Sequence, residues 1–207
     1  MAYFPMFINL TDSDCLIVGG GKVAYRKIKV LLDFGARVHV VAKDISKEVK
    51  LLSQEADCLF LEQREFKPSD LDNKCLVVAA TTDYTLNSQI ASLCNDAKIP
   101  VNVVDCSQLC TFIFPSYIKE QDLVGAFSSS GKSPVITQIL RDQTKEIFNP
   151  KLGKINELLG QWRSRLIKQF PSEAARKKAI RHLIDFALSY DGIPSDDQIE
   201  SELQRLI

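Results

Sequence analysis

The sequence predicts an α/β fold: a doubly wound parallel sheet of the Rossmann type, then a small α+β dimerisation domain and a C-terminal helical domain. Three observations predict it. Apolar, strand-like runs alternate with helical patterns up to residue 110. Three consecutive glycines, Gly19 to Gly21, stand between one such run and the first helix. From residue 150 onward the pattern is helical. We therefore divide the chain into residues 1–110, 111–149 and 150–207.

The glycine stretch has the strand, turn and helix context of a dinucleotide fingerprint. Gly19 suits the sharp turn, Gly21 lets the backbone approach a pyrophosphate, and Ala24 allows close packing of helix on strand. Lys22 and Val23 open the helix, whose free N–H groups and positive dipole end favour the pyrophosphate. A plain connector is the alternative, but the flanking strand and helix favour cofactor binding.

The first helix is predicted over residues 22–34, and Gly35 ends it at a position that favours a positive φ. The second strand, residues 37–42, is followed by Lys43 and Asp44. In many dinucleotide folds an acid at the end of this strand binds the ribose hydroxyls. Asp44 is placed for that role, whereas Lys43 leaves a 2′-phosphate open. We favour NAD over NADP on this ground.

Three more strands follow, over residues 58–61, 75–80 and 101–105. Thr81 and Thr82 come after the second of these, at the sheet edge where open α/β folds bind ligands, although ordinary loop and cap roles are equally open. Asp83 caps the next helix, which carries an apolar face.

The third of these strands ends at Asp105, and this carboxylate is our candidate for the catalytic residue. A general base has to lie at this edge if a hydride leaves the same substrate for a nicotinamide. A strand-terminal Asp that only caps the next turn is the competing interpretation.

Short strands are predicted over 111–114, 117–119 and 123–127, the last two as a hairpin. A helix with Ser133 as N-cap and Pro134 at its first position carries apolar residues as far as Ile147. Such a small three-stranded sheet with one apolar helix suits pairing with a second copy of the chain.

The loop before this helix is the candidate substrate site: Ser128, Ser129, Ser130, Gly131, Lys132 and Ser133. Hydroxyls, N–H groups and a lysine at a helix start suit a carboxylate or a phosphate. The loop could also be a simple cap, and phosphorylated serines would oppose an anionic ligand. It is not a P-loop, because the upstream glycine of that motif is absent.

Helices are predicted over 151–170 and 172–189, and Ser195 with Gln198 forms a capping box for the last one. Residues 151–182 hold nine Lys or Arg against two acids, while residues 183–207 hold one against six. The basic region could meet an anionic partner.

Composition excludes several classes. The chain has 26 basic and 26 acidic residues, no run near the roughly 20 apolar residues of a membrane span, and no secretory signal pattern. Its six cysteines form no C-x-x-C pair, which favours a reducing cytoplasm. Cys106 and Cys110 make a poor metal site without nearby histidines, and we expect no bound metal cofactor. His39 and His182 show no partner in the sequence, so we expect structural or solvated roles.

With these segments placed, the sequence resembles the siroheme synthase N-terminal module, that is, the precorrin-2 dehydrogenase and sirohydrochlorin ferrochelatase family. The matching stretches are residues 5–8, 15–27, 79–83, 102–105, 111–116 and 128–134. Similarity extends more weakly through the C-terminal helices, so the resemblance covers nearly the whole chain. The resemblance implies an NAD-binding Rossmann domain and an intertwined homodimer with the active site between subunits. It also implies oxidation of precorrin-2 to sirohydrochlorin, a tetrapyrrole whose carboxylates suit the basic C-terminal region. Asp105 matches the aspartate that is implicated in this family as the proton acceptor in the oxidation.

Bifunctional members also insert ferrous iron, as a substrate and not a structural metal, to give siroheme, and the residues leave this second activity open. Larger relatives continue into a methyltransferase domain beyond the last residue of this sequence, so we expect precorrin-2 to come from another protein. The alternatives are another small dehydrogenation, or a non-catalytic NAD or redox sensor whose basic helices bind nucleic acid. The sensor leaves Asp105 and the serine loop without a role, so we expect no nucleic-acid partner.

Overall fold

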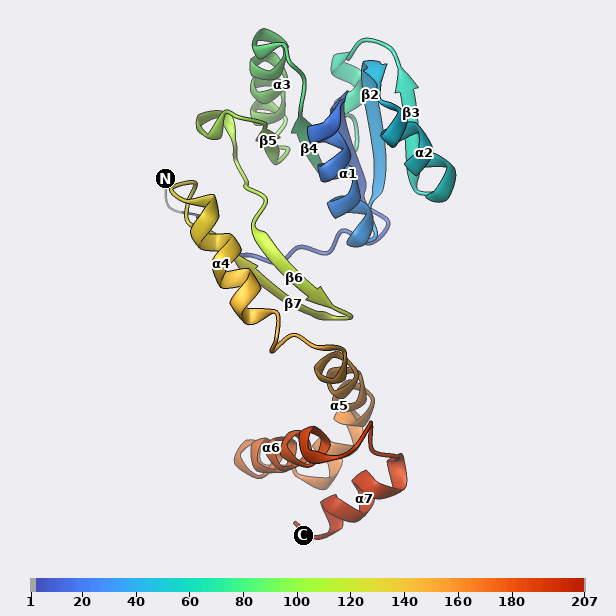
Figure 1. The fold of residues 1–207 in the computed structure, drawn as a ribbon, viewed down its shortest axis with the longest axis vertical. Coiled ribbons are helices and arrows are strands. Elements are labelled where there is room, and N and C mark those ends of the chain that lie inside the picture. Colours follow the sequence, from blue (N-terminus) through green and yellow to red (C-terminus); the bar gives the residue numbers. More distant parts are fainter. Residues whose placement is uncertain (1–2, 207) are drawn as a thin grey trace. The chain divides into compact units, whose positions relative to one another are not determined.

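The computed structural model describes residues 3–206, and its contacts divide the chain into two units, Met1–Phe114 and Pro115–Ile207 (Figure 1). Each unit has a hydrophobic core of its own. The division falls after Phe114 rather than at residue 110, because residues 110–114 pack back onto the first unit. The limits of three domains stay a prediction.

The first unit is built on a five-stranded parallel sheet of order β3-β2-β1-β4-β5 (Figure 1). The strands are β1 (Asp14–Gly20), β2 (Arg37–Ile45), β3 (Leu59–Gln63), β4 (Leu76–Ala79) and β5 (Val101–Val103). The chain builds outward from β1 through β2 and β3, then returns to add β4 and β5 on the other side. This reversal between β1 and β4 is the switch point at which such sheets bind ligands. The predicted fold class is confirmed.

Helices cover both faces of this sheet. α1 (Lys22–Asp33) and α2 (Lys47–Glu55) pack on one face, and α3 (Tyr84–Asp96) packs on the other (Figure 1). β1 is buried on both faces, as its continuous apolar run predicts. Two short 3-10 turns, η1 (Pro68–Leu71) and η2 (Ser107–Leu109), complete the unit.

The sequence did not predict α2. Its segment is polar and buries only Val49, so its apolar periodicity is too weak to see. The Ser46 hydroxyl caps it by accepting a hydrogen bond from the Val49 N–H at 3.4 Å. β2 also runs three residues farther than predicted and includes Lys43 and Asp44.

The prediction of a strand over residues 111–114 was wrong. The Val101 N–H donates to the Thr111 hydroxyl at 2.7 Å, and the Asn102 side chain donates to the Phe112 carbonyl at 3.1 Å. These bonds fasten the segment beside β5, and the ring of Phe114 packs against the core under α1. A small sheet therefore forms from two strands in the second unit instead of three.

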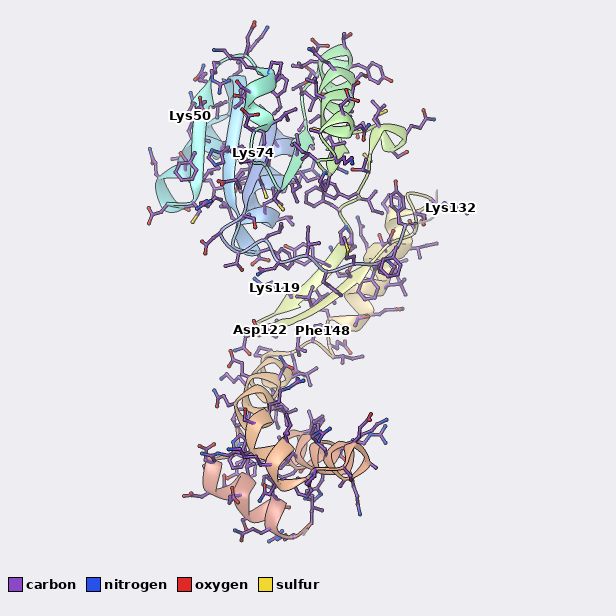
Figure 2. All side chains as sticks on the ribbon, turned by 180° about the vertical axis from the view of Figure 1, so that it is seen from behind. Lys50, Lys74, Lys119, Asp122, Lys132 and Phe148 are labelled. Atoms are coloured by element: carbon purple, nitrogen blue, oxygen red, sulfur yellow. The ribbon has the colours of Figure 1, made fainter. Side chains whose placement is uncertain are left out.

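That second unit begins with the predicted hairpin of β6 (Ser116–Glu120) and β7 (Leu123–Phe127). α4 (Pro134–Thr144) follows with the predicted cap, and it ends before Ile147. Figure 2 labels Phe148 below the hairpin, and a Cβ on Gly125 would stand 3.1 Å from its ring. Gly125 thus leaves room for this ring.

The C-terminal helices are α5 (Pro150–Gln169), α6 (Glu173–Ser189) and α7 (Asp196–Gln204). They share a core that contains Trp162, Leu166, Leu183, Ile199 and Leu203. The predicted capping box of Ser195 and Gln198 is confirmed. Within residues 3–206, we find no helix with the length and apolarity that a bilayer crossing requires.

Candidate functional site

The three glycines at the end of β1 and the start of α1 have different structural roles. Gly19 has φ +122°, and a Cβ built on it would lie 2.3 Å from the Ala80 carbonyl oxygen. A Cβ on Gly20 would lie 2.4 Å from the Asp44 carbonyl oxygen. A Cβ on Gly21 would meet nothing within 4 Å. The first two glycines therefore let neighbouring strand ends approach, while the third keeps open the space in front of α1.

The start of α1 is suited to an anion. No side chain caps it and its first turn has no acidic residue, whereas the other six α-helices of residues 3–206 have side-chain caps at Ser46, Asp83, Ser133, Asn149, Ser172 and Ser195. The first N–H groups of a helix need outside partners. Lys22 and Val23 open α1, and the buried Ala24 packs it against the sheet. These features fit a pyrophosphate held by main-chain N–H groups.

The end of β2 lies against the glycine turn, where the Ser46 N–H donates to the Gly20 carbonyl at 2.9 Å. Lys43 and Asp44 are both exposed there. The Lys43 ammonium lies 2.9 Å from the Glu65 carboxylate, and this partner raises the pKa of Lys43. The residues that would face the adenosine ribose therefore form a charged group of both signs.

Thr81 and Thr82 follow β4 and lie beside the turn, since the Thr81 nitrogen is 3.2 Å from the Cβ position of Gly19. Thr81 is fixed by the buried Asn87: its hydroxyl donates to the Asn87 amide oxygen at 2.7 Å, and the Asn87 amide donates to the Thr81 carbonyl at 3.1 Å. We did not single out Asn87 from the sequence. Its signal is a polar side chain on the same helical face as Ile90 and Cys94.

Asp105 lies two residues past β5, in a turn rather than in the strand. It is exposed and has φ +59°, a left-handed conformation that Asp and Asn adopt more readily than most residues. The Val104 N–H donates to the Ala79 carbonyl at 3.0 Å, which holds this turn to the end of β4. The glycine turn, the threonines and Asp105 thus follow the carboxyl ends of three adjacent strands.

Cys110 is a structural residue of this edge. Its buried thiol accepts a hydrogen bond from the Val103 N–H at 3.1 Å, and burial raises its pKa. A protonated thiol in a main-chain network is a poor metal ligand. Among residues 3–206, no group of three or more His, Cys, Asp or Glu residues is arranged to hold a metal ion.

The serine loop belongs to the second unit, and its hydroxyls serve its own backbone. Ser128 accepts from the Ser130 N–H at 3.0 Å, Ser129 from the Ser133 N–H at 2.9 Å, and Ser133 caps α4. Ser130 and Gly131 have φ +55° and +79°. Lys132 is exposed next to the start of α4 (Figure 2). Substrate binding by this loop stays a prediction.

Both histidines have partners that the sequence did not show. The His39 ring lies 2.8 Å from the Asp14 carboxylate, and the His182 ring lies 2.9 Å from that of Glu202. The first pair joins β1 to β2 and the second joins α6 to α7. Neither pair lies at the carboxyl edge of the sheet.

A hollow of about 890 Å³ is formed by the turn of the β6–β7 hairpin, α5 and α6. It is lined by both signs of charge, including Arg163, Arg176, Asp122 and Glu157. We place the candidate site at the sheet edge instead, because the glycine turn and the uncapped start of α1 offer main-chain N–H groups to an anion.

Comparisons with known proteins identify the family of the chain. Residues 6–116 match the family described as "Putative NAD(P)-binding". The siroheme synthase of Nitrosomonas europaea is 36% identical over 177 residues, which are 86% of this chain and 37% of that protein. Siroheme synthase 2 of Yersinia pestis is 39% identical over 207 residues, or 99% of this chain and 43% of that protein. The chain therefore spans less than half the length of these relatives.

A solved structure of SirC, precorrin-2 dehydrogenase, matches with a TM-score of 0.78 at 23% identity and covers 99% of this chain and 98% of its own. At this identity the match shows a shared fold. The resemblance to the siroheme synthase N-terminal module is confirmed by the relatives. The chain therefore belongs to the "Putative NAD(P)-binding" family, as a module related to the siroheme synthases.

Proposed function

We propose that this chain oxidises precorrin-2 to sirohydrochlorin with NAD as the hydride acceptor. The relatives named siroheme synthase support the pathway, and the SirC structure supports the architecture. The observation that carries the proposal is Asp105, an exposed carboxylate at the sheet edge that also bears the glycine turn. Six free cysteines fit the reducing cytoplasm in which we place the reaction.

The oxidation removes two hydrogens from precorrin-2. When bound, NAD⁺ supplies the acceptor for one of them as a hydride, which carries both electrons. The Asp105 carboxylate accepts the other as a proton and later releases it to water. The products are sirohydrochlorin, NADH and one proton. A positioned general base contributes about 10² to 10⁴ in rate.

The test uses precorrin-2 and NAD⁺ with absorbance at 340 nm. Asp105→Asn should lower turnover by about 10² or more while the affinity for NAD⁺ stays within about twofold. Asn tolerates the left-handed backbone, so the change removes the base without adding strain. Asp12→Asn is the matched control, because Asp12 is exposed, has φ +57° and precedes β1. Unchanged turnover in Asp105→Asn would remove this residue from the mechanism.

We extend the proposal to iron insertion because these relatives are named for siroheme synthesis. Fe²⁺ would enter sirohydrochlorin as two pyrrole protons leave, with Asp105 again as the proton acceptor. Anaerobic addition of ferrous iron to the completed first reaction tests this step. A spectral change no faster than the uncatalysed rate would leave the chain a dehydrogenase only.

We further propose a homodimer that covers α4. This helix and the residues after it expose large apolar side chains: Val135, Ile136, Ile139, Leu140 and Ile147 are between 43% and 63% exposed. A second copy would bury this face and bring a second serine loop to the assembly. The molar mass by light scattering should be about twice that of the chain, and Ile139→Glu should give monomers. A monomeric wild-type protein would contradict the proposal.

A further inference from the structure

The ion pair of Lys43 and Glu65 lies at the place where two kinds of dinucleotide differ. NAD and NADP are identical except for a phosphate on the 2′ oxygen of the adenosine ribose. In dinucleotide folds that ribose binds at the carboxyl end of the second strand, and a basic residue nearby accommodates the phosphate. Here that end carries Lys43, the kind of side chain an NADP site uses, but its ammonium lies 2.9 Å from the Glu65 carboxylate.

The main chain of Glu65 is fixed by its neighbour Arg64, while the Glu65 side chain is 75% exposed. The Arg64 guanidinium donates to the Glu65 carbonyl at 2.9 Å and to the Asp70 carboxylate at 2.7 and 2.8 Å. Arg64 also donates to Glu62 at 2.9 Å. Lys43 and Arg64 therefore have carboxylate partners already, whereas the Lys50 ammonium at the end of β3 donates to the Gln63 amide oxygen at 3.2 Å.

The carboxylates around Lys43 disfavour the binding of a further anion there. Besides Glu65, the carboxylates of Asp83 and Asp44 act on Lys43. A 2′-phosphate carries about −1.5 to −2 charges near neutral pH. It would have to displace Glu65 from Lys43 and remain among three carboxylates, whereas the 2′-hydroxyl of NAD can donate a hydrogen bond to one of them.

We propose that Glu65 is a specificity-determining residue: it occupies Lys43, repels a 2′-phosphate and so selects NAD over NADP. The inference rests on the dinucleotide binding within the proposed function, but not on the oxidation of precorrin-2. Lys43 is the attractive element for a phosphate, and Glu65 is the repulsive element that cancels it.

The test measures the binding of NAD⁺ and NADP⁺ by calorimetry to the wild-type chain and three variants, at about 0.1 M salt. Glu65→Gln should tighten NADP⁺ binding by about three- to tenfold and leave NAD⁺ within about twofold. Glu62→Gln is the matched control, since it removes the same charge from a carboxylate that pairs with Arg64 instead. It should change both affinities less than about twofold. Glu65→Gln combined with Lys43→Gln should lose the gain for NADP⁺.

Three results would overturn the inference: wild-type protein that binds NADP⁺ as tightly as NAD⁺, an unchanged ratio of affinities in Glu65→Gln, or an equal gain in Glu62→Gln. The outcome is separable from the proposed function. A chain that binds NAD⁺ and responds to Glu65→Gln but does not oxidise precorrin-2 would refute the activity and support the inference. A chain that binds neither dinucleotide would refute both.

Discussion

A single added methyl group at Gly21 should separate cofactor binding from folding. The new Cβ would meet no heavy atom within 4 Å, and the backbone at Gly21 has φ −88°, which any residue adopts. We therefore expect the free energy of unfolding of Gly21→Ala to stay within about 0.5 kcal/mol of wild type. The methyl group would nevertheless occupy the space through which a pyrophosphate reaches the start of α1. Losing one charge-assisted hydrogen bond costs about 1.5 to 3 kcal/mol, so the Kd for NAD⁺ should rise about tenfold to a hundredfold.

Gly19→Ala provides the contrast. Its Cβ would overlap the Ala80 carbonyl oxygen at 2.3 Å, and φ +122° is a conformation that L residues rarely adopt. Backbone strain costs about 1 to 3 kcal/mol, and the overlap also pushes β1 away from β4. A loss of about 3 kcal/mol or more is expected, a large part of the stability of an ordinary domain.

The assay has to report the first unit. The single tryptophan, Trp162, lies in the second unit, so urea unfolding should be followed by far-UV circular dichroism and calorimetry. NAD⁺ binding is measured by titration calorimetry below the unfolding transition. Wild-type affinity for NAD⁺ in Gly21→Ala would refute the placement of the pyrophosphate. A loss of stability in Gly21→Ala as large as that in Gly19→Ala would support the connector interpretation of the glycines.

Three further predictions concern stability and thiol reactivity. Hydrogen bonds from Arg37 and His39, together with their charges, hold the pKa of Asp14 at about 2, below its ordinary value of 3.8. The free energy of unfolding of Asp14→Asn should therefore be about 1 kcal/mol lower than that of wild type above pH 4. This difference, measured by urea unfolding, should vanish as pH falls towards 2. Trp162→Phe should destabilise the second unit by about 1 to 2 kcal/mol, because the Asp196 carboxylate loses the indole N–H that donates to it at 2.9 Å. Cys58 and Cys75 are exposed and should react quickly with a thiol reagent, whereas Cys15, whose pKa burial raises to about 12, should react only after unfolding.

Local signals made much of the fold predictable. Fully apolar runs such as residues 75–80 become central parallel strands, and cap residues such as Asp83 and Ser133 begin helices where predicted. The glycine turn was predictable because its strand and helix are adjacent in the sequence. Each of these signals lies within a few residues of the feature it predicts.

Apart from α2, whose apolar periodicity is weak, the features that the sequence did not predict depend on contacts between distant residues. The segment 111–114 has the composition of a strand. However, two side-chain hydrogen bonds fasten it beside β5: the Thr111 hydroxyl accepts from the Val101 N–H, and the Asn102 amide donates to the Phe112 carbonyl. The pairing of Lys43 with Glu65 joins the ends of two strands and leaves no pattern in the sequence. Asn87 is visible only as one polar residue on an apolar face.

The features of the site therefore have two different causes: main-chain geometry for the glycine turn, and the choice of side chain for Glu65 and Asp105. Gly21 at the N-cap leaves the first turn of α1 without a side-chain cap, and the pairing of β1 with β4 brings Ala80 so close to Gly19 that only glycine fits there. These main-chain features are the basis on which we propose the pyrophosphate position. Nothing in the topology requires an acid at position 65 or in the turn after β5. If Glu65 selects the cofactor and Asp105 takes the proton, both are side chains that could be changed without altering the fold. Substitutions at these two positions should accordingly change specificity and rate while leaving the free energy of unfolding nearly constant.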